Sequence, residues 1–267
     1  MCSSDLPGQP MPRAHWRQDD PDTMDVGDVY GGGSPTGITV YENGALGAAW
    51  EGTLLNCEPS RNTVLAYKLV AQKGTYALSE ATRKDLITSN PAREFVGTDF
   101  KKISAEEAAK PNERILFRPS DVAVGPDGAV YVADWYDSRV GGHQTLDDTC
   151  TGAIYRIAPK GFKSVIPKID LSTPAGAAAV LRNPAVNVRH LGFNALKGFG
   201  AKSLPAVSEI LRDANPYVAA RGVWLLPHLG DEGVARVKAL AKDRSEEHTS
   251  ELQSHSDLVC RLLLEKK

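Results

Sequence analysis

The chain lacks a marked excess of charge of either sign. Its 267 residues include 31 Lys and Arg residues against 33 Asp and Glu residues, for a formal net charge of −2. This balance gives no electrostatic reason to expect nucleic acid or an anionic membrane as a partner. The chain also lacks an apolar run long enough to cross a bilayer. We therefore expect no nucleic-acid partner and no membrane span in this part of the protein.

Cysteine is scarce as well. The chain has four cysteines, of which Cys2 and Cys260 lie near its ends and only Cys57 and Cys150 lie in its interior. Two thiols are too few for a structural zinc site. A Cys57–Cys150 disulfide would require Cα atoms within about 7 Å of each other. Such a disulfide and two separate buried thiols are both open at this stage.

The two ends of the sequence do not read as natural protein. Residues 1–6, MCSSDL, and residues 244–267, which begin RSEEHTSELQSH, correspond in frame to translated sequencing adapter. We interpret both segments as artefacts and take residues 7–243 as the natural chain. The two segments hold four basic and six acidic residues, so the remaining chain has no formal net charge.

Residues 7–159 have a β pattern. Strand-like runs separated by Gly, Pro, Asn and Asp occur at 37–41, 53–57, 63–69, 76–78, 121–124, 129–133 and 153–157. The stretches 53–69 and 129–158 both read strand, acid, basic loop, strand, with Glu58 and Asp134 in equivalent places. The second stretch carries an insertion at about 135–151. Repetition on this scale predicts the last two to three blades of a β-propeller, too few to close a disc.

Residues 160–180 are predicted to be a linker, and residues 181–243 to be two helical repeats. The copies 181–211 and 211–241 align Gly200 with Gly230 and Arg189 with Arg221. Asn183 and Asn215 each precede a proline, and we expect each asparagine to cap a helix that begins at that proline. The pattern predicts an α-solenoid fragment of the HEAT type.

The loop after the strand at 129–133 carries the candidate functional residues. Carboxylates and an imidazole in one loop could move protons from a substrate hydroxyl or hold Ca²⁺ beside a quinone. Alternatively, Asp134 closes the strand end by accepting backbone N–H bonds, with Arg139 as its partner. The catalytic candidates are His143 and Asp137. The candidates for contact with substrate or cofactor are Asp134, Trp135, Tyr136, Arg139 and Glu58. Asp147 and Asp148 are weaker metal candidates, because such a pair is more often a solvated turn.

Several long motifs carry a family resemblance. They include GDVYGGGSPTGITVYENGALG at 27–47, LLNCEPSRN at 54–62, EFVGTDF at 94–100 and FRPSDVAVGPDGAVYVADWYDSRVGGH at 117–143. With the helical pair, they resemble a family of bacterial proteins described as membrane-bound dehydrogenases. The propeller of that family is similar to that of quinoprotein glucose and sorbosone dehydrogenases.

The resemblance implies a six-bladed propeller followed by HEAT repeats in an exported, periplasmic or cell-surface oxidoreductase. It implies a sugar or alcohol substrate, and PQQ, Ca²⁺ and haem c as cofactors of the full-length protein. The usual CxxCH haem motif does not occur in this sequence, so haem is assigned to no residue here. A rival hypothesis is a non-enzymatic scaffold that binds a glycan at the propeller or a protein partner on the HEAT surface.

Overall fold

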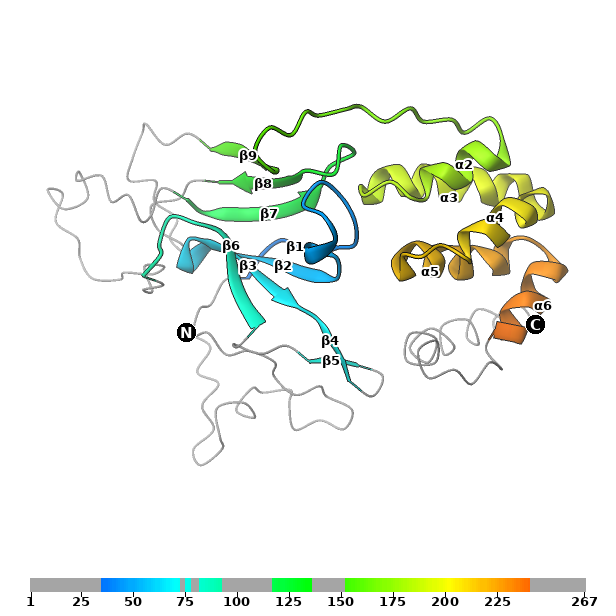
Figure 1. Ribbon diagram of the computed structural model, residues 1–267, viewed down its shortest axis with the longest axis horizontal. Helices are drawn as coiled ribbons and strands as arrows, with labels where there is room; N and C mark the ends of the chain where they lie inside the picture. The colour runs from blue at the N-terminus through cyan, green and yellow to red at the C-terminus, as the bar shows by residue number, and fades with distance from the viewer. Residues whose placement is uncertain (1–34, 73–74, 78–81, 93–116, 136–151, 241–267) are drawn as a thin grey trace, which may run out of the picture.

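The computed structural model describes residues 35–72, 75–77, 82–92, 117–135 and 152–240, with the strands first and the helices after them (Figure 1). The strands are β1 (Ile38–Tyr41), β2 (Thr53–Glu58), β3 (Thr63–Lys68), β4 (Val70–Gln72), β5 (Thr75–Ala77), β6 (Arg83–Thr88), β7 (Pro119–Val124), β8 (Val130–Asp134) and β9 (Ala153–Ile157). The helices are α2 (Pro174–Val180), α3 (Val186–Phe199), α4 (Leu204–Ile210), α5 (Pro216–Leu225) and α6 (Asp231–Leu240), with short 3₁₀ turns between some of them.

The strands form antiparallel sheets. The largest has the order β1-β2-β3-β6, a second has the order β7-β8-β9, and β4 pairs with β5 in a separate ribbon. The strands β1-β2-β3 and β7-β8-β9 therefore follow the same order, and β1 and β2 both contact β7. Buried side chains from both sheets form one core, which includes Tyr41, Leu55, Val64, Val122, Val130 and Val132.

The predicted strands at 37–41, 53–57, 63–69, 121–124, 129–133 and 153–157 all occur, with ends that differ by at most two residues. The predicted insertion also occurs, because β8 and β9 are separated by residues 135–152 whereas β2 and β3 are separated only by residues 59–62. The strands β4 and β6 are additional. No closed ring of sheets forms among the described residues.

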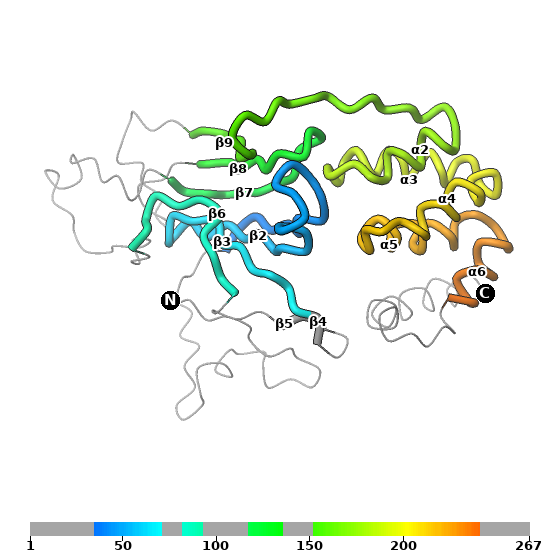
Figure 2. Tube along the Cα trace, viewed as in Figure 1, coloured from blue at the N-terminus to red at the C-terminus, as the bar shows by residue number. Residues whose placement is uncertain are grey.

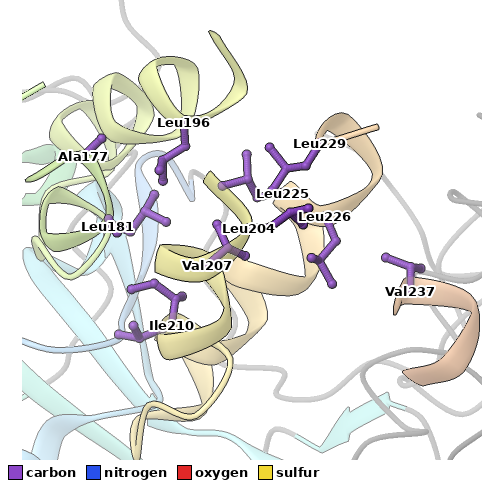
Figure 3. Close-up of a cluster of buried hydrophobic side chains, with 12 residues drawn as sticks. Ala177, Leu181, Leu196, Leu204, Val207, Ile210, Leu225, Leu226, Leu229 and Val237 are labelled. Atoms are coloured by element: carbon purple, nitrogen blue, oxygen red, sulfur yellow. The ribbon is translucent and has the colours of Figure 1, made fainter. Parts of the chain in front are cut away.

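The helical part packs around its own apolar core. Leucine and valine side chains from successive helices meet in this core, and Figure 3 shows Leu181, Leu196, Leu204, Ile210 and Leu225 pointing toward one another. Helices α3 and α5 begin 30 residues apart, at Val186 and Pro216. The repeat spacing read from the sequence therefore corresponds to the helix spacing in the structure.

The connection between the two parts differs from the predicted linker. An extended segment leaves β9 and runs across to the helices (Figures 1 and 2), but α2 already begins at Pro174, inside the 160–180 range. The Thr173 side chain accepts a hydrogen bond from the backbone N–H of Gly176, and Pro174 occupies the first turn. This is a favourable helix start, and an alanine-rich helix follows it.

The expected asparagine caps occur in one repeat only. Asn215 caps α5, because its side chain accepts hydrogen bonds from the backbone N–H groups of Tyr217 and Val218. Helix α3, in contrast, begins at Val186 with Ala185 as the capping residue. The expected Asn183 cap is therefore wrong: its Oδ1 atom accepts from the N–H of Ala185 in a turn that precedes the helix.

Candidate functional site

Two of the predicted site residues lie at the ends of corresponding strands in the two larger sheets. Glu58 is the last residue of β2 and Asp134 is the last residue of β8, opposite Thr63 of β3 and Ala153 of β9 respectively. Both carboxylates are buried, with 0% and 5% of the residue exposed. The equivalence read from the sequence is therefore an equivalence of position in the two sheets.

Backbone hydrogen bonds fix Asp134 at the end of β8, the central strand of its sheet. Its Oδ1 atom accepts a hydrogen bond of 2.9 Å from the N–H of Arg118, and the N–H of Trp135 donates to the Arg118 carbonyl. Burial, followed by the charge of Asp134 and a hydrogen bond with it, raises the pKa of the Tyr155 phenol on β9. These contacts are the ones expected if Asp134 closes the strand end.

Glu58 stabilises the turn that follows β2. Its Oε1 atom accepts a hydrogen bond of 3.1 Å from the N–H of Ser60, the arrangement of a helix N-cap. Asn62 ends the turn with a positive φ of 56°, a conformation that asparagine adopts more readily than most residues. Its Nδ2 atom donates to the Phe117 carbonyl next to β7. The turn after β2 is thus bonded to the start of the neighbouring sheet.

Arg118 connects these two strand ends. The residue is fully buried, and its Nη1 atom donates a hydrogen bond of 2.7 Å to the Pro59 carbonyl in the turn capped by Glu58, while its backbone binds Asp134. A buried guanidinium requires hydrogen-bond acceptors, and the Pro59 carbonyl is one of them. Arg118, Glu58 and Asp134 form a buried polar cluster between the sheets.

Trp135 follows directly after this cluster and is 59% exposed. The other loop candidates, which are Tyr136, Asp137, Arg139, His143, Asp147 and Asp148, lie outside the described residues, as does Cys150. Cys57 is a free, buried thiol on β2.

The cofactors implied by the resemblance were tested against the described side chains. Ca²⁺ requires six to eight oxygen ligands. Within the described ranges, no three His, Cys, Asp or Glu side chains are grouped so that they could hold a metal ion. We therefore assign Ca²⁺ to none of the described residues. In that same part, no helix is both long and apolar enough to span a membrane.

A second polar site lies between the β part and the helical part, and the sequence analysis did not assign it. Glu42, directly after β1, accepts hydrogen bonds at Oε2 from Arg189 of α3 and Arg221 of α5. Its backbone carbonyl accepts a further bond of 3.1 Å from Nδ2 of Asn215. Glu42 therefore ties both helices to the turn between β1 and β2.

Arg189 and Arg221 are largely buried at this site, with 13% of each side chain exposed. Removal from water lowers the pKa of both guanidinium groups to about 10, so both remain charged at neutral pH. One signal for this site was visible in the sequence. An arginine recurs at aligned positions of the two repeats, although nothing in the sequence indicates Glu42 as its partner.

The described residues define a two-part protein, in which antiparallel sheets joined by buried polar contacts are followed by helices hydrogen-bonded to the β part through Glu42, Asn43 and Asn183. Residues 8–161, more than half of the chain, match the family described as "Domain of unknown function (DUF7133)". The chain belongs to this family, and the match covers the β part up to the segment after β9. Comparison with curated proteins and comparison with solved structures each found no match.

Proposed function

We propose that the chain is part of an exported redox protein that resembles sugar and alcohol dehydrogenases. In this proposal the two larger sheets are neighbouring blades of a six-bladed β-propeller, and the helices begin a HEAT-type solenoid. The shared strand order and the contact of β1 and β2 with β7 support the neighbouring blades. The 30-residue spacing of the helices supports the solenoid.

The observation that carries the proposal is the change from a buried to an exposed residue at the end of β8. Asp134 is buried and bonded to the backbone, and the next residue, Trp135, is exposed. Propellers bind ligands with loops held at the ends of rigid strands. Asp137, Arg139 and His143 follow shortly after this fixed strand end in the sequence.

The proposed reaction is oxidation of a C–OH group of a sugar or alcohol to a carbonyl. His143 or Asp137 takes the hydroxyl proton as general base, and the carbon loses a hydride with its two electrons. The resemblance implies a quinone cofactor that accepts this pair and a haem c module that receives the electrons afterwards. No described residue is assigned to either group, and no further step is assigned to the chain.

Dye-linked turnover in the full-length protein tests this proposal. We expect reduction of an artificial electron acceptor in the presence of a sugar or alcohol. The variants H143A and D137A should each lower kcat/KM, by at least about 100-fold for the residue that serves as the base. The control variant R212Q changes an exposed arginine of the helical part and should keep wild-type turnover. If neither H143A nor D137A changes turnover, this assignment is wrong.

A non-enzymatic scaffold is the second candidate, and the same strand ends favour it. Glu58 and Asp134 each use a carboxylate oxygen to bind a backbone N–H, which is a structural task. The exposed Trp135 offers a flat face for stacking on a sugar ring. Under this hypothesis the β part binds a glycan without turnover. A glycan array with wild type and W135A decides the point, since binding that W135A abolishes, in a protein without dye-linked turnover, favours the scaffold.

A further inference from the structure

A pocket of about 280 Å³ lies between α3 and α5, beside the turn that follows β1. Its apolar wall includes Val186 and Phe193 of α3 and Trp224 of α5. Its polar wall is formed by Glu42, Arg189 and Arg221. This volume lies just below the range of about 300–1,000 Å³ that is typical of small-molecule pockets, so it suits a small organic molecule. The pocket lies on helices anchored to the β part, away from the strand ends considered above.

The charges in this pocket are unbalanced. Arg189 and Arg221 both donate to the same oxygen of Glu42, so two permanent cations share one carboxylate. Mostly buried guanidinium groups have lost much of their hydration, so an additional anion nearby would stabilise them. The unbalanced positive charge selects for an anionic ligand.

The two arginines also have hydrogen-bonding capacity left over. Each guanidinium carries five N–H groups. Among the described residues, Arg189 donates only to Glu42, while Arg221 donates to Glu42 and to the Leu181 carbonyl. Arginine binds carboxylates through two parallel N–H···O bonds, which gives geometric selectivity as well as energy. Both the charge and the donors therefore suit a carboxylate.

The apolar wall indicates what the rest of such a ligand contains. Phe193 and Trp224 place two aromatic rings on the pocket, and Val186, at the first position of α3, is 63% exposed. A fully hydrated inorganic anion would gain nothing from these side chains. An aromatic or branched aliphatic body would bury apolar surface against them.

We propose that this pocket binds a small organic carboxylate, with its anionic group at Arg189 and Arg221 and an aromatic or branched body against Phe193 and Trp224. The proposal does not depend on the redox function, because it uses none of the residues at the ends of β2 and β8. A ligand here contacts both α3 and α5 beside Glu42. Its binding therefore stabilises the junction between the two parts of the protein.

Isothermal titration calorimetry on the whole chain tests the proposal with benzoate and benzamide as matched probes. The two share a ring and nearly the same size, but only benzoate carries a charge. We expect benzoate to bind at least about ten times more tightly, since a hydrogen-bonded charge pair contributes enough for one factor of ten. We also expect its affinity to fall as salt concentration rises. This comparison needs no substitution and therefore does not depend on how any variant folds.

Three variants locate the site. R189Q removes one cation and should weaken benzoate binding about ten-fold or more. E42Q removes the competing carboxylate and should strengthen binding several-fold, a change opposite in sign to the one that general damage to the junction would cause. R212Q removes an exposed arginine that pairs with Glu209 on the helix surface and should leave the affinity unchanged.

Several results would overturn the proposal. One is the absence of benzoate binding to wild type at millimolar concentration, and another is equal affinity for benzoate and benzamide. A third is an R189Q variant with wild-type circular dichroism and unchanged benzoate affinity. A fourth is an E42Q variant, equally well folded, in which the affinity falls.

Discussion

The Arg221 guanidinium on α5 donates a hydrogen bond to the Glu42 carboxylate at the end of β1, across 179 positions of the sequence. Arg189 of α3 donates to the same oxygen. The contribution of such an ion pair to folding stability depends on both partners, because a largely buried charge without its counter-charge is destabilising. Glu42 is therefore the shared counter-charge of two arginines where the helices meet the β part.

Replacement of Glu42 by alanine should destabilise the protein. It leaves Arg189 and Arg221, both largely buried, without their shared carboxylate. We expect a loss of about 2–4 kcal/mol in the free energy of unfolding, within the range for a buried charge whose partner is removed. Urea titration followed by circular dichroism measures it. The matched control is E209A, which removes an exposed i,i+3 partner of Arg212 and should cost less than about 0.5 kcal/mol. Equal losses in the two variants would contradict this role of Glu42.

Asn215 has two functions that substitutions can separate. Its Oδ1 atom caps α5, and its Nδ2 atom donates to the Glu42 carbonyl. N215A loses both and should cost about 1.5–3 kcal/mol, the sum of a cap and a hydrogen bond. N215S keeps a cap acceptor and lacks the amide donor, so it should cost less. Thermal unfolding of both variants measures the difference, and an N215S variant no more stable than N215A would show that the cap contributes little.

The sequence predicts the elements that depend on local pattern. Alternating Val residues on either side of a Gly-Pro-Asp-Gly turn predicted β7 and β8, and the turn is present, with Gly128 at a φ of +84°. The recurrence of the acidic strand ends placed Glu58 and Asp134 correctly relative to each other. The turn depends on adjacent residues and the second feature on a repeated motif, so both can be read directly from the sequence.

Strand β6 could not be predicted from the alternation of apolar and polar residues. Arg83, Lys84 and Asp85 occupy the first half of β6 and interrupt any apolar alternation. The segment is a strand because β3 pairs with it, through a register shift at Val64 and Leu65. That information lies in the partner strand and not in residues 83–88.

The junction between the two parts was the least predictable feature. The hydrogen bonds to Glu42 join residues 147 and 179 positions apart, and no local pattern records such distances. Helix α2 was not predicted either, although its start has a local signal in the sequence. A threonine before a proline and an alanine-rich run is a recognisable helix start, but its short length and the nearby Pro and Lys residues favoured a linker.

Asp127 should give the protein a contribution to stability that depends on pH. Burial alone would raise the pKa of its carboxyl group, but hydrogen bonds from Ser164, the Ala129 N–H and Tyr131, together with the charge of Arg156, lower it. A lowered pKa in the folded state means that the stabilisation is present above the ordinary Asp pKa of about 3.9 and is lost as pH falls through the folded value.

The variant D127N tests this contribution. It should be less stable than wild type by about 1–2 kcal/mol at pH 7, because the hydrogen bonds to a charged acceptor become weaker. The difference should shrink as the pH falls below about 4. Urea midpoints of both proteins between pH 7 and pH 3 measure it. A difference that stays constant over this range would mean that the charge of Asp127 does not contribute.

Cys57 should be inert in the folded protein. Burial, followed by the negative charge of Asp121, raises the pKa of its thiol from 9.0 to about 12, so the reactive thiolate is suppressed at neutral pH. We expect iodoacetamide at pH 8 to leave Cys57 unmodified in the folded chain and to modify it fully in urea, as measured by peptide mass mapping. Because the folded pKa is raised, stability should fall as pH rises from about 9 toward 12, and C57A should remove that part of the fall. Rapid labelling of Cys57 in the folded chain would show that β2 opens to solvent more often than its buried position implies.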